Sequence, residues 1–79
     1  MKLRVYWIRD GKTTYYRVED VEEAKKIIER ETQKDLHDLR ITWNASGLEV
    51  YEDGEWCEYY NEDGLDIKEI MEEDEEKQI

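Results

Sequence analysis

The first eighteen residues alternate between apolar and polar side chains, with the two-residue period of β-strands. Two such stretches, residues 2–9 and 12–18, flank Asp10-Gly11, a dipeptide that favours a two-residue type I′ turn because both turn positions need a positive φ. Folding the chain there sorts the side chains by polarity. One face then carries Leu3, Val5, Trp7, Tyr16 and Val18. The pattern therefore predicts a β-hairpin with one core-facing side.

The next segment has the 3.6-residue period of an α-helix. Its apolar residues form a single stripe: Val21, Ala24, Ile27 and Ile28. Asp20, followed three residues later by Glu23, resembles a capping box at the start of a helix. We expect a helix over residues 20–32 that fades between Thr32 and Asp35, with its stripe packed on a sheet.

Three more strands are expected after this helix. Residues 39–43 alternate apolar and polar, residues 44–47 have the composition of a four-residue loop, and residues 48–52 alternate again. Asp53-Gly54 then predicts a second two-residue turn. Folding at that turn places four residues on the core face: Leu48, Val50, Cys57 and Tyr59. Trp43 and Ile41 would extend this face.

The predicted fold class is α+β, with the order ββαβββ and a mainly antiparallel five-stranded sheet packed on one helix. Asp66 and Glu69 can begin a short C-terminal helix. Residues 1–71 would form a single α+β domain, and residues 72–79 an acidic flexible tail, because five consecutive acids repel one another. One helix cannot cover five strands, so the C-terminal helix or a partner should cover the rest of the core face.

Charge is distributed unevenly along the 79 residues, whose net charge is −11. Residues 1–48 contain ten Lys/Arg and nine Asp/Glu, whereas residues 49–79 contain two Lys and fourteen Asp/Glu. Such a chain repels nucleic acid and anionic membranes, because both are polyanions. We therefore expect neither direct nucleic-acid binding nor membrane binding, and a basic protein as the partner.

Candidate chemistry other than binding is weakly supported by the residues. Placing Gly54 or Gly64 at the centre of an EF-hand loop puts Tyr60 or Ile70 where a bidentate Glu is needed, so both fits fail, although loose calcium binding stays open. His37 is expected to be exposed, and Cys57 to be an inert thiol on the core face. We predict no enzymatic activity, no cofactor and no metal site. No apolar run reaches the roughly 20 residues of a membrane span, and we expect a cytoplasmic protein.

Carboxylates and aromatic rings are expected together on the outside of the second hairpin. The predicted binding residues are Glu49, Tyr51, Glu52, Asp53, Glu55, Trp56, Glu58, Tyr60, Glu62 and Asp63. Two other interpretations stay open. The acids would form a solvated face that prevents edge-to-edge aggregation, or Arg4 and Arg17 would pair with Glu49 and Glu58 if the two hairpins adjoin.

The segment GLEVYEDGEWCEYYNEDGLDI, together with the acids after it, resembles small acidic proteins of phages and mobile elements of Gram-positive bacteria. The likeness covers about residues 41–76. It implies a nucleic-acid mimic that inhibits a host nuclease or another DNA- or RNA-binding protein, inside a bacterial host cell. The alternative is a structural or oligomeric module, in which Trp7 or Trp43 drives self-association and the acids only provide solubility. The protein would be a monomer or a homodimer.

Overall fold

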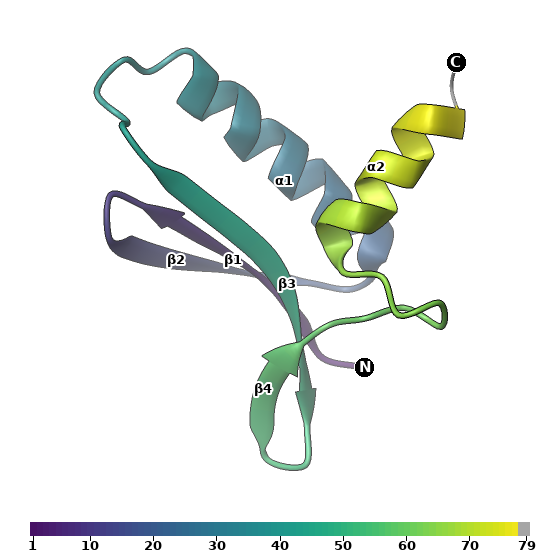
Figure 1. Ribbon diagram of the computed structural model, residues 1–79. Helices are drawn as coiled ribbons and strands as arrows, with labels where there is room; N and C mark the ends of the chain where they lie inside the picture. The colour runs from purple at the N-terminus through teal and green to yellow at the C-terminus, as the bar shows by residue number, and fades with distance from the viewer. Residues whose placement is uncertain (78–79) are drawn as a thin grey trace.

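A computed structural model describes residues 1–77. The elements are β1 (Leu3–Arg9), β2 (Lys12–Val18), α1 (Val21–Leu36), β3 (Asn44–Glu52), β4 (Glu55–Glu58) and α2 (Ile67–Lys77). The strands form one antiparallel sheet of order β2-β1-β3-β4 (Figure 1). Residues of both helices join the buried face of this sheet. We call the opposite side of the sheet the open face. The fold is thus α+β, with a four-stranded sheet and two helices.

Both predicted hairpins form in the predicted register. β1 pairs with β2 so that Leu3 lies opposite Val18, and β3 pairs with β4 so that Val50 lies opposite Cys57. At the first turn Asp10 has a φ of 47° and Gly11 a φ of 88°. These positive values are those that a type I′ turn requires. The turn dipeptides therefore determine the pairing of both hairpins, as the sequence predicted.

The expected fifth strand over residues 39–43 is wrong, and so is the expected loop over residues 44–47. Residues 44–47 are the first part of β3 and pair with β1, which places Asn44 opposite Arg9. Ile41 and Trp43, which were expected to extend the core face, lie in the connection before β3 instead, where Ile41 is half-buried and Trp43 is 54% exposed. Leu39 of the expected strand is 96% exposed. The sheet consequently has four strands, and β3 spans the whole length of β1.

Local hydrogen bonds explain why residues 38–43 do not become a strand. Asp10 accepts bonds from the Trp43 amide at 3.0 Å and from the Thr42 hydroxyl at 2.7 Å, and its own amide donates to the Trp43 carbonyl at 3.0 Å. Asp38 accepts from the backbone and side chain of Arg40, each at 3.0 Å. These side chains satisfy the backbone groups that a strand would have paired.

The core lies between the sheet and the two helices. Its fully or nearly buried apolar residues are Leu3, Val5, Trp7, Val18, Ala24, Ile28, Leu48, Val50 and Ile67. This group includes every residue of β1 that was predicted for the core, namely Leu3, Val5 and Trp7, and also Val18 of β2. Ile67 belongs to α2, so the C-terminal helix covers part of the sheet. This cover was expected because one helix is too small to cover the whole core face.

Capping boxes begin both helices. Asp20 accepts a bond from the Glu23 amide at 2.8 Å, and the Glu23 side chain accepts from the Glu19 amide at 3.1 Å. Asp66 and Glu69 bond each other's amides at 2.9 and 3.3 Å. α2 then continues to Lys77, so residues 72–77 of the expected tail are helical here. The flexibility of this segment stays a prediction, and residues 78–79 lie outside the described part of the chain.

Candidate functional site

The predicted binding residues separate into two groups. Four lie on the open face, on β3 and β4: Glu49, Tyr51, Trp56 and Glu58. Six lie at or beside the β3–β4 turn and in the loop that follows β4: Glu52, Asp53, Glu55, Tyr60, Glu62 and Asp63. The two groups have different electrostatic surroundings. The expected row of carboxylates is therefore divided into a neutralised part and an uncompensated part.

Cations from the first hairpin neutralise the open face. Arg4 Nε donates to Glu49 Oε1 at 2.8 Å. The guanidinium carbon of Arg4 also lies 3.9 Å from the ring centre of Tyr15 and 4.2 Å from that of Trp56. The guanidinium of Arg17 lies 5.6 Å from the Trp56 ring centre. The pairing of Arg4 with Glu49, which the sequence left open, is thus present, whereas Arg17 lies over a ring.

Tyr6 connects three strands of the open face. Its ring lies against Gly47 on β3, where a Cβ atom would collide with it. Its hydroxyl donates to Glu58 Oε2 on β4 at 3.3 Å. Burial and the adjacent Glu58 carboxylate raise the pKa of the Tyr6 phenol to about 12, so the phenol stays a hydrogen-bond donor at neutral pH. Burial also raises the pKa of the Glu58 carboxyl. Glu58 is therefore held by Tyr6.

The uncompensated carboxylates form what we call the acidic rim: Glu52, Asp53, Glu55, Glu62 and Asp63. All five are exposed. Within residues 1–75, whose side chains are described, none of the five takes part in an ion pair. Asp53 and Gly54 have φ values of 50° and 85°, so a type I′ turn presents the first three acids.

Asn61 shapes the loop that carries the other two acids of the rim. Its side-chain oxygen accepts from the amides of Asp63 and Leu65, each at 2.9 Å. Its backbone amide donates to the Leu65 carbonyl at 2.9 Å, and its carbonyl accepts from Gly64 at 3.0 Å. An asparagine that bonds its own backbone in this way stabilises a tight turn. Glu62 and Asp63 therefore project from a defined loop.

A shallow hollow joins the two parts of the acidic rim. Its volume is about 350 Å³, and its lining residues are Met1, Val50, Glu52, Glu58, Tyr59, Tyr60, Asn61 and Glu62. The carboxylates of Glu52, Glu58 and Glu62 thus share the lining with apolar and aromatic side chains. Tyr60, one of the lining residues, is 59% exposed. A Lys or Arg side chain suits such a hollow, because carboxylates accept its hydrogen bonds and aromatic rings stabilise its charge.

Two residues considered for chemistry lie outside this hollow. Cys57 is half-buried on the core face, where burial, and then Glu55 and Glu52, raise the pKa of its thiol. The thiol is therefore the dominant form at neutral pH, which disfavours nucleophilic reaction. His37 is exposed at the end of α1. Among the described residues, no three His, Cys, Asp or Glu side chains are arranged to hold a metal ion.

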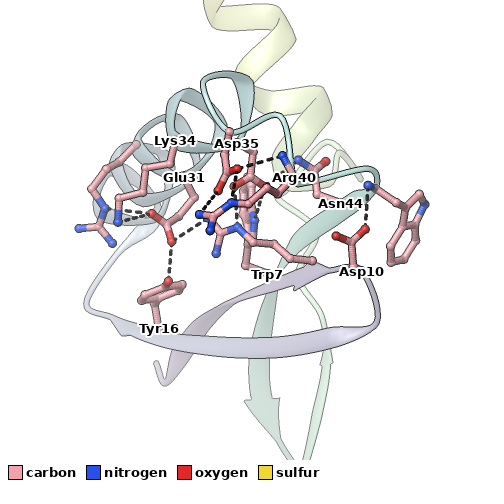
Figure 2. Close-up of polar contacts among 12 residues, drawn as sticks. Trp7, Asp10, Tyr16, Glu31, Lys34, Asp35, Arg40 and Asn44 are labelled. Carbon is pink, nitrogen blue, oxygen red and sulfur yellow. Dashed lines mark hydrogen bonds and ion pairs between the residues drawn. The ribbon is translucent and has the colours of Figure 1, made fainter.

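A buried carboxylate network joins α1 to the sheet and was not predicted from the sequence (Figure 2). Glu31 is 1% exposed and accepts from the Tyr16 hydroxyl at 2.5 Å, from Arg9 at 3.2 Å and from Lys34 at 3.1 Å. Asp35 accepts from Arg9 at 2.5 Å and from the Trp7 indole at 3.0 Å. Because every buried side-chain polar atom of the described residues has a partner, the network is satisfied.

The position of Glu31 in the helical pattern could have revealed this network. Ala24, Ile28, Glu31 and Asp35 follow a spacing of four, three and four residues, so both acids continue the apolar stripe. Arg9 likewise continues the core-facing alternation of β1. A charged residue at a core position usually has a buried partner of opposite charge. The partners of Glu31 and Asp35 come from both strands of the first hairpin: Trp7 and Arg9 from β1, and Tyr16 from β2.

The pKa of Glu31 predicts a loss of stability in acid. Burial would raise this pKa, but hydrogen bonds from Tyr16, Lys34 and Arg9 outweigh it and lower the pKa from 4.5 to about 2. A depressed folded-state pKa stabilises the fold above the unfolded pKa, and this contribution disappears as the pH falls through the folded value. We expect the free energy of unfolding, measured with urea, to be lower at pH 2 than at pH 7 by roughly 3 kcal/mol because of Glu31. The variant Glu31→Gln should lack this part of the pH dependence. If the free energy of unfolding of Glu31→Gln depended on pH as strongly as that of the wild type, Glu31 would not be the source of the acid sensitivity.

Comparisons with known proteins do not identify a relative: no family model, curated protein or solved structure matches the chain. Within the described residues, no helix is both long enough and apolar enough to cross a bilayer.

Proposed function

We propose that this protein is a non-enzymatic acidic binding protein whose acidic rim docks on a basic surface of a partner protein. The hollow between the β3–β4 turn and the loop after β4 would take a Lys or Arg side chain of that partner. The observation that carries this proposal is the set of five exposed carboxylates without a counter-charge among the described side chains. Electrostatic complementarity would speed association, and Tyr60 would add desolvated contact area.

The partner class follows from the sign and the clustering of the charges. A surface with several clustered cations is common on proteins that bind the phosphates of DNA or RNA. We therefore infer that the partner is a nucleic-acid-binding protein of a bacterial host, such as a nuclease, and that the acidic rim competes with nucleic acid for its basic groove. The resemblance to small acidic phage proteins supports the same inference. It also leads us to expect action in the cytoplasm of the host.

Reversing charges on the rim tests this proposal. The variant Glu52→Lys, Glu55→Lys, Glu62→Lys leaves Asp53 unchanged, because a positive φ suits Asp better than Lys. The control variant reverses three exposed acids of α2, Glu72, Glu73 and Glu75, with the same change in net charge. Each protein is immobilised and exposed to a bacterial lysate at low salt.

We expect the wild-type protein and the α2 variant to retain basic proteins that added duplex DNA releases. The rim variant should lose at least nine-tenths of this retention while keeping its melting temperature within a few degrees. Equal loss in both variants would show that total charge and not the rim matters. Full retention by the rim variant would contradict the proposal.

A structural or oligomeric module is the second candidate, and one observation favours it. The open face carries exposed or half-buried aromatic residues that neither helix covers, including Tyr15, which is 52% exposed, and Tyr51, which is 39% exposed. Trp7 is 3% exposed and is therefore not free to drive self-association, contrary to one of our expectations. If self-association occurs, the open face is its more suitable surface.

A further inference from the structure

The charges of the open face form an ordered row across the whole sheet. The register places Arg17 of β2 opposite Arg4 of β1, Arg4 opposite Glu49 of β3, and Glu49 opposite Glu58 of β4. The row therefore runs positive, positive, negative, negative from one edge of the sheet to the other. Its midpoint lies between β1 and β3, the two central strands.

This order of signs is complementary to itself under one rotation. Consider a two-fold axis that runs parallel to the strands, above the midpoint of the row, between two facing copies. The rotation places β2 of one copy over β4 of the other, and β1 over β3. Arg17 then faces the second copy's Glu58, and Arg4 faces its Glu49. Because the interface is isologous, each of these contacts occurs twice.

We propose that the protein forms a homodimer through its open faces, related by this two-fold axis. The chemistry of the face suits an interface, because Tyr, Trp and Arg are enriched at protein–protein contacts and the face holds all three. Arg4 lies between the rings of Tyr15 and Trp56, so its side chain is already ordered and less conformational entropy is lost on association. Two sheets packed face to face lie about 10 Å apart, within reach of these long side chains.

The net charge of −11 opposes self-association only weakly in this geometry. The row of Arg4, Arg17, Glu49 and Glu58 has no net charge, and Lys2 adds one positive charge over the Tyr51 ring. The excess acids lie on the acidic rim and on α2, and most of these acids would be far from the contact. At physiological salt, exposed charges more than about 8 Å apart are largely screened. Glu58 belongs to the row and also lines the hollow, but the five acids of the acidic rim lie outside the row. Arg17→Glu therefore tests the dimer without changing the docking site, and the rim variant tests docking without changing the row.

Charge reversal at the two ends of the row gives a sharp test. Arg17 and Glu58 belong to opposite edge strands and form no ion pair with each other within the described residues. In a dimer of the Arg17→Glu variant, the new glutamate of each copy would face Glu58 of the other copy. In a dimer of the Glu58→Arg variant, the new arginine of each copy would face Arg17 of the other copy. In a mixed dimer of the two variants, both end contacts join opposite charges again.

Sedimentation equilibrium and native mass spectrometry measure the outcome. The wild-type protein should have twice the 9.7 kDa mass of the chain. Each variant alone should have the mass of one chain, and an equimolar mixture should form the mixed dimer. Lys12→Glu and Glu55→Arg reverse the same charges on β2 and β4 but lie outside the row, so they should remain dimeric.

The melting temperature of each variant is measured first, because Glu58 is held by Tyr6. If Glu58→Arg melts early, Glu58→Lys takes its place in the mixture. A wild-type protein that stays monomeric at millimolar concentration would overturn the proposal. Dimeric single variants, or a mixture that stays monomeric while the wild type dimerises, would overturn the assigned face and axis.

Discussion

Replacing Glu31 with alanine is expected to remove most of the stability of the fold. The carboxylate is buried and accepts hydrogen bonds from Tyr16, Arg9 and Lys34. Without it, the Tyr16 hydroxyl and part of the Arg9 guanidinium lose their partners at a site with little access to water. Removing one member of a buried charged network costs about 3–5 kcal/mol, whereas a domain of this size is stable by about 5 kcal/mol.

Urea unfolding followed by circular dichroism measures this loss. Glu29→Ala is the matched control, because Glu29 is exposed on the same helix, two residues earlier. A surface substitution of this kind changes stability by less than about 0.5 kcal/mol. If the two alanine variants unfold at the same urea concentration, Glu31 does not hold α1 on the sheet.

Gly47→Ala is expected to destabilise the sheet through the Tyr6 ring. A Cβ atom at residue 47 would lie 2.5 Å from Cζ and 2.7 Å from Cε1 of that ring. The ring would have to swing away, which breaks its hydrogen bond to Glu58 and exposes the contact between β1 and β3. Overpacking of this kind costs about 1–3 kcal/mol.

A double-mutant cycle separates the collision from other effects of the methyl group. In a Tyr6→Ala background the obstructing ring is absent, so Gly47→Ala should cost much less than in the wild type. The free energies of unfolding of the four proteins give the coupling between the two residues. A coupling near zero would show that the ring does not restrict residue 47.

Local signals were sufficient to predict the hairpins and both helix starts. Asp10-Gly11 and Asp53-Gly54 each require a particular turn, and a two-residue turn determines every cross-strand pair that follows from it. Asp20 and Asp66, each with a Glu three residues later, marked the capping boxes. Turns and helix caps depend on residues that lie within a few positions of one another, so a single sequence is enough to predict them.

Features that depend on distant contacts were not predicted. The composition of residues 44–47 suggested a loop, but small residues also allow a neighbouring side chain to lie across a strand, and Tyr6 does so at Gly47. The alternation in residues 39–43 suggested a strand, but Asp10 holds Trp43 by hydrogen bonds from another part of the chain. The division of the candidate site has the same origin, since the order β2-β1-β3-β4 brings Arg4 beside Glu49.

The central functional claim is that the acidic rim, and not the open face or α2, meets the basic partner. Backbone amide chemical shifts of isotope-labelled protein, titrated with a basic protein retained from the lysate, test it most directly. We expect the largest shift changes to cluster at residues 52–55 and 60–63 and to disappear when duplex DNA is added. Changes concentrated on α2, or on Arg4, Tyr15 and Arg17 of the open face, would contradict it.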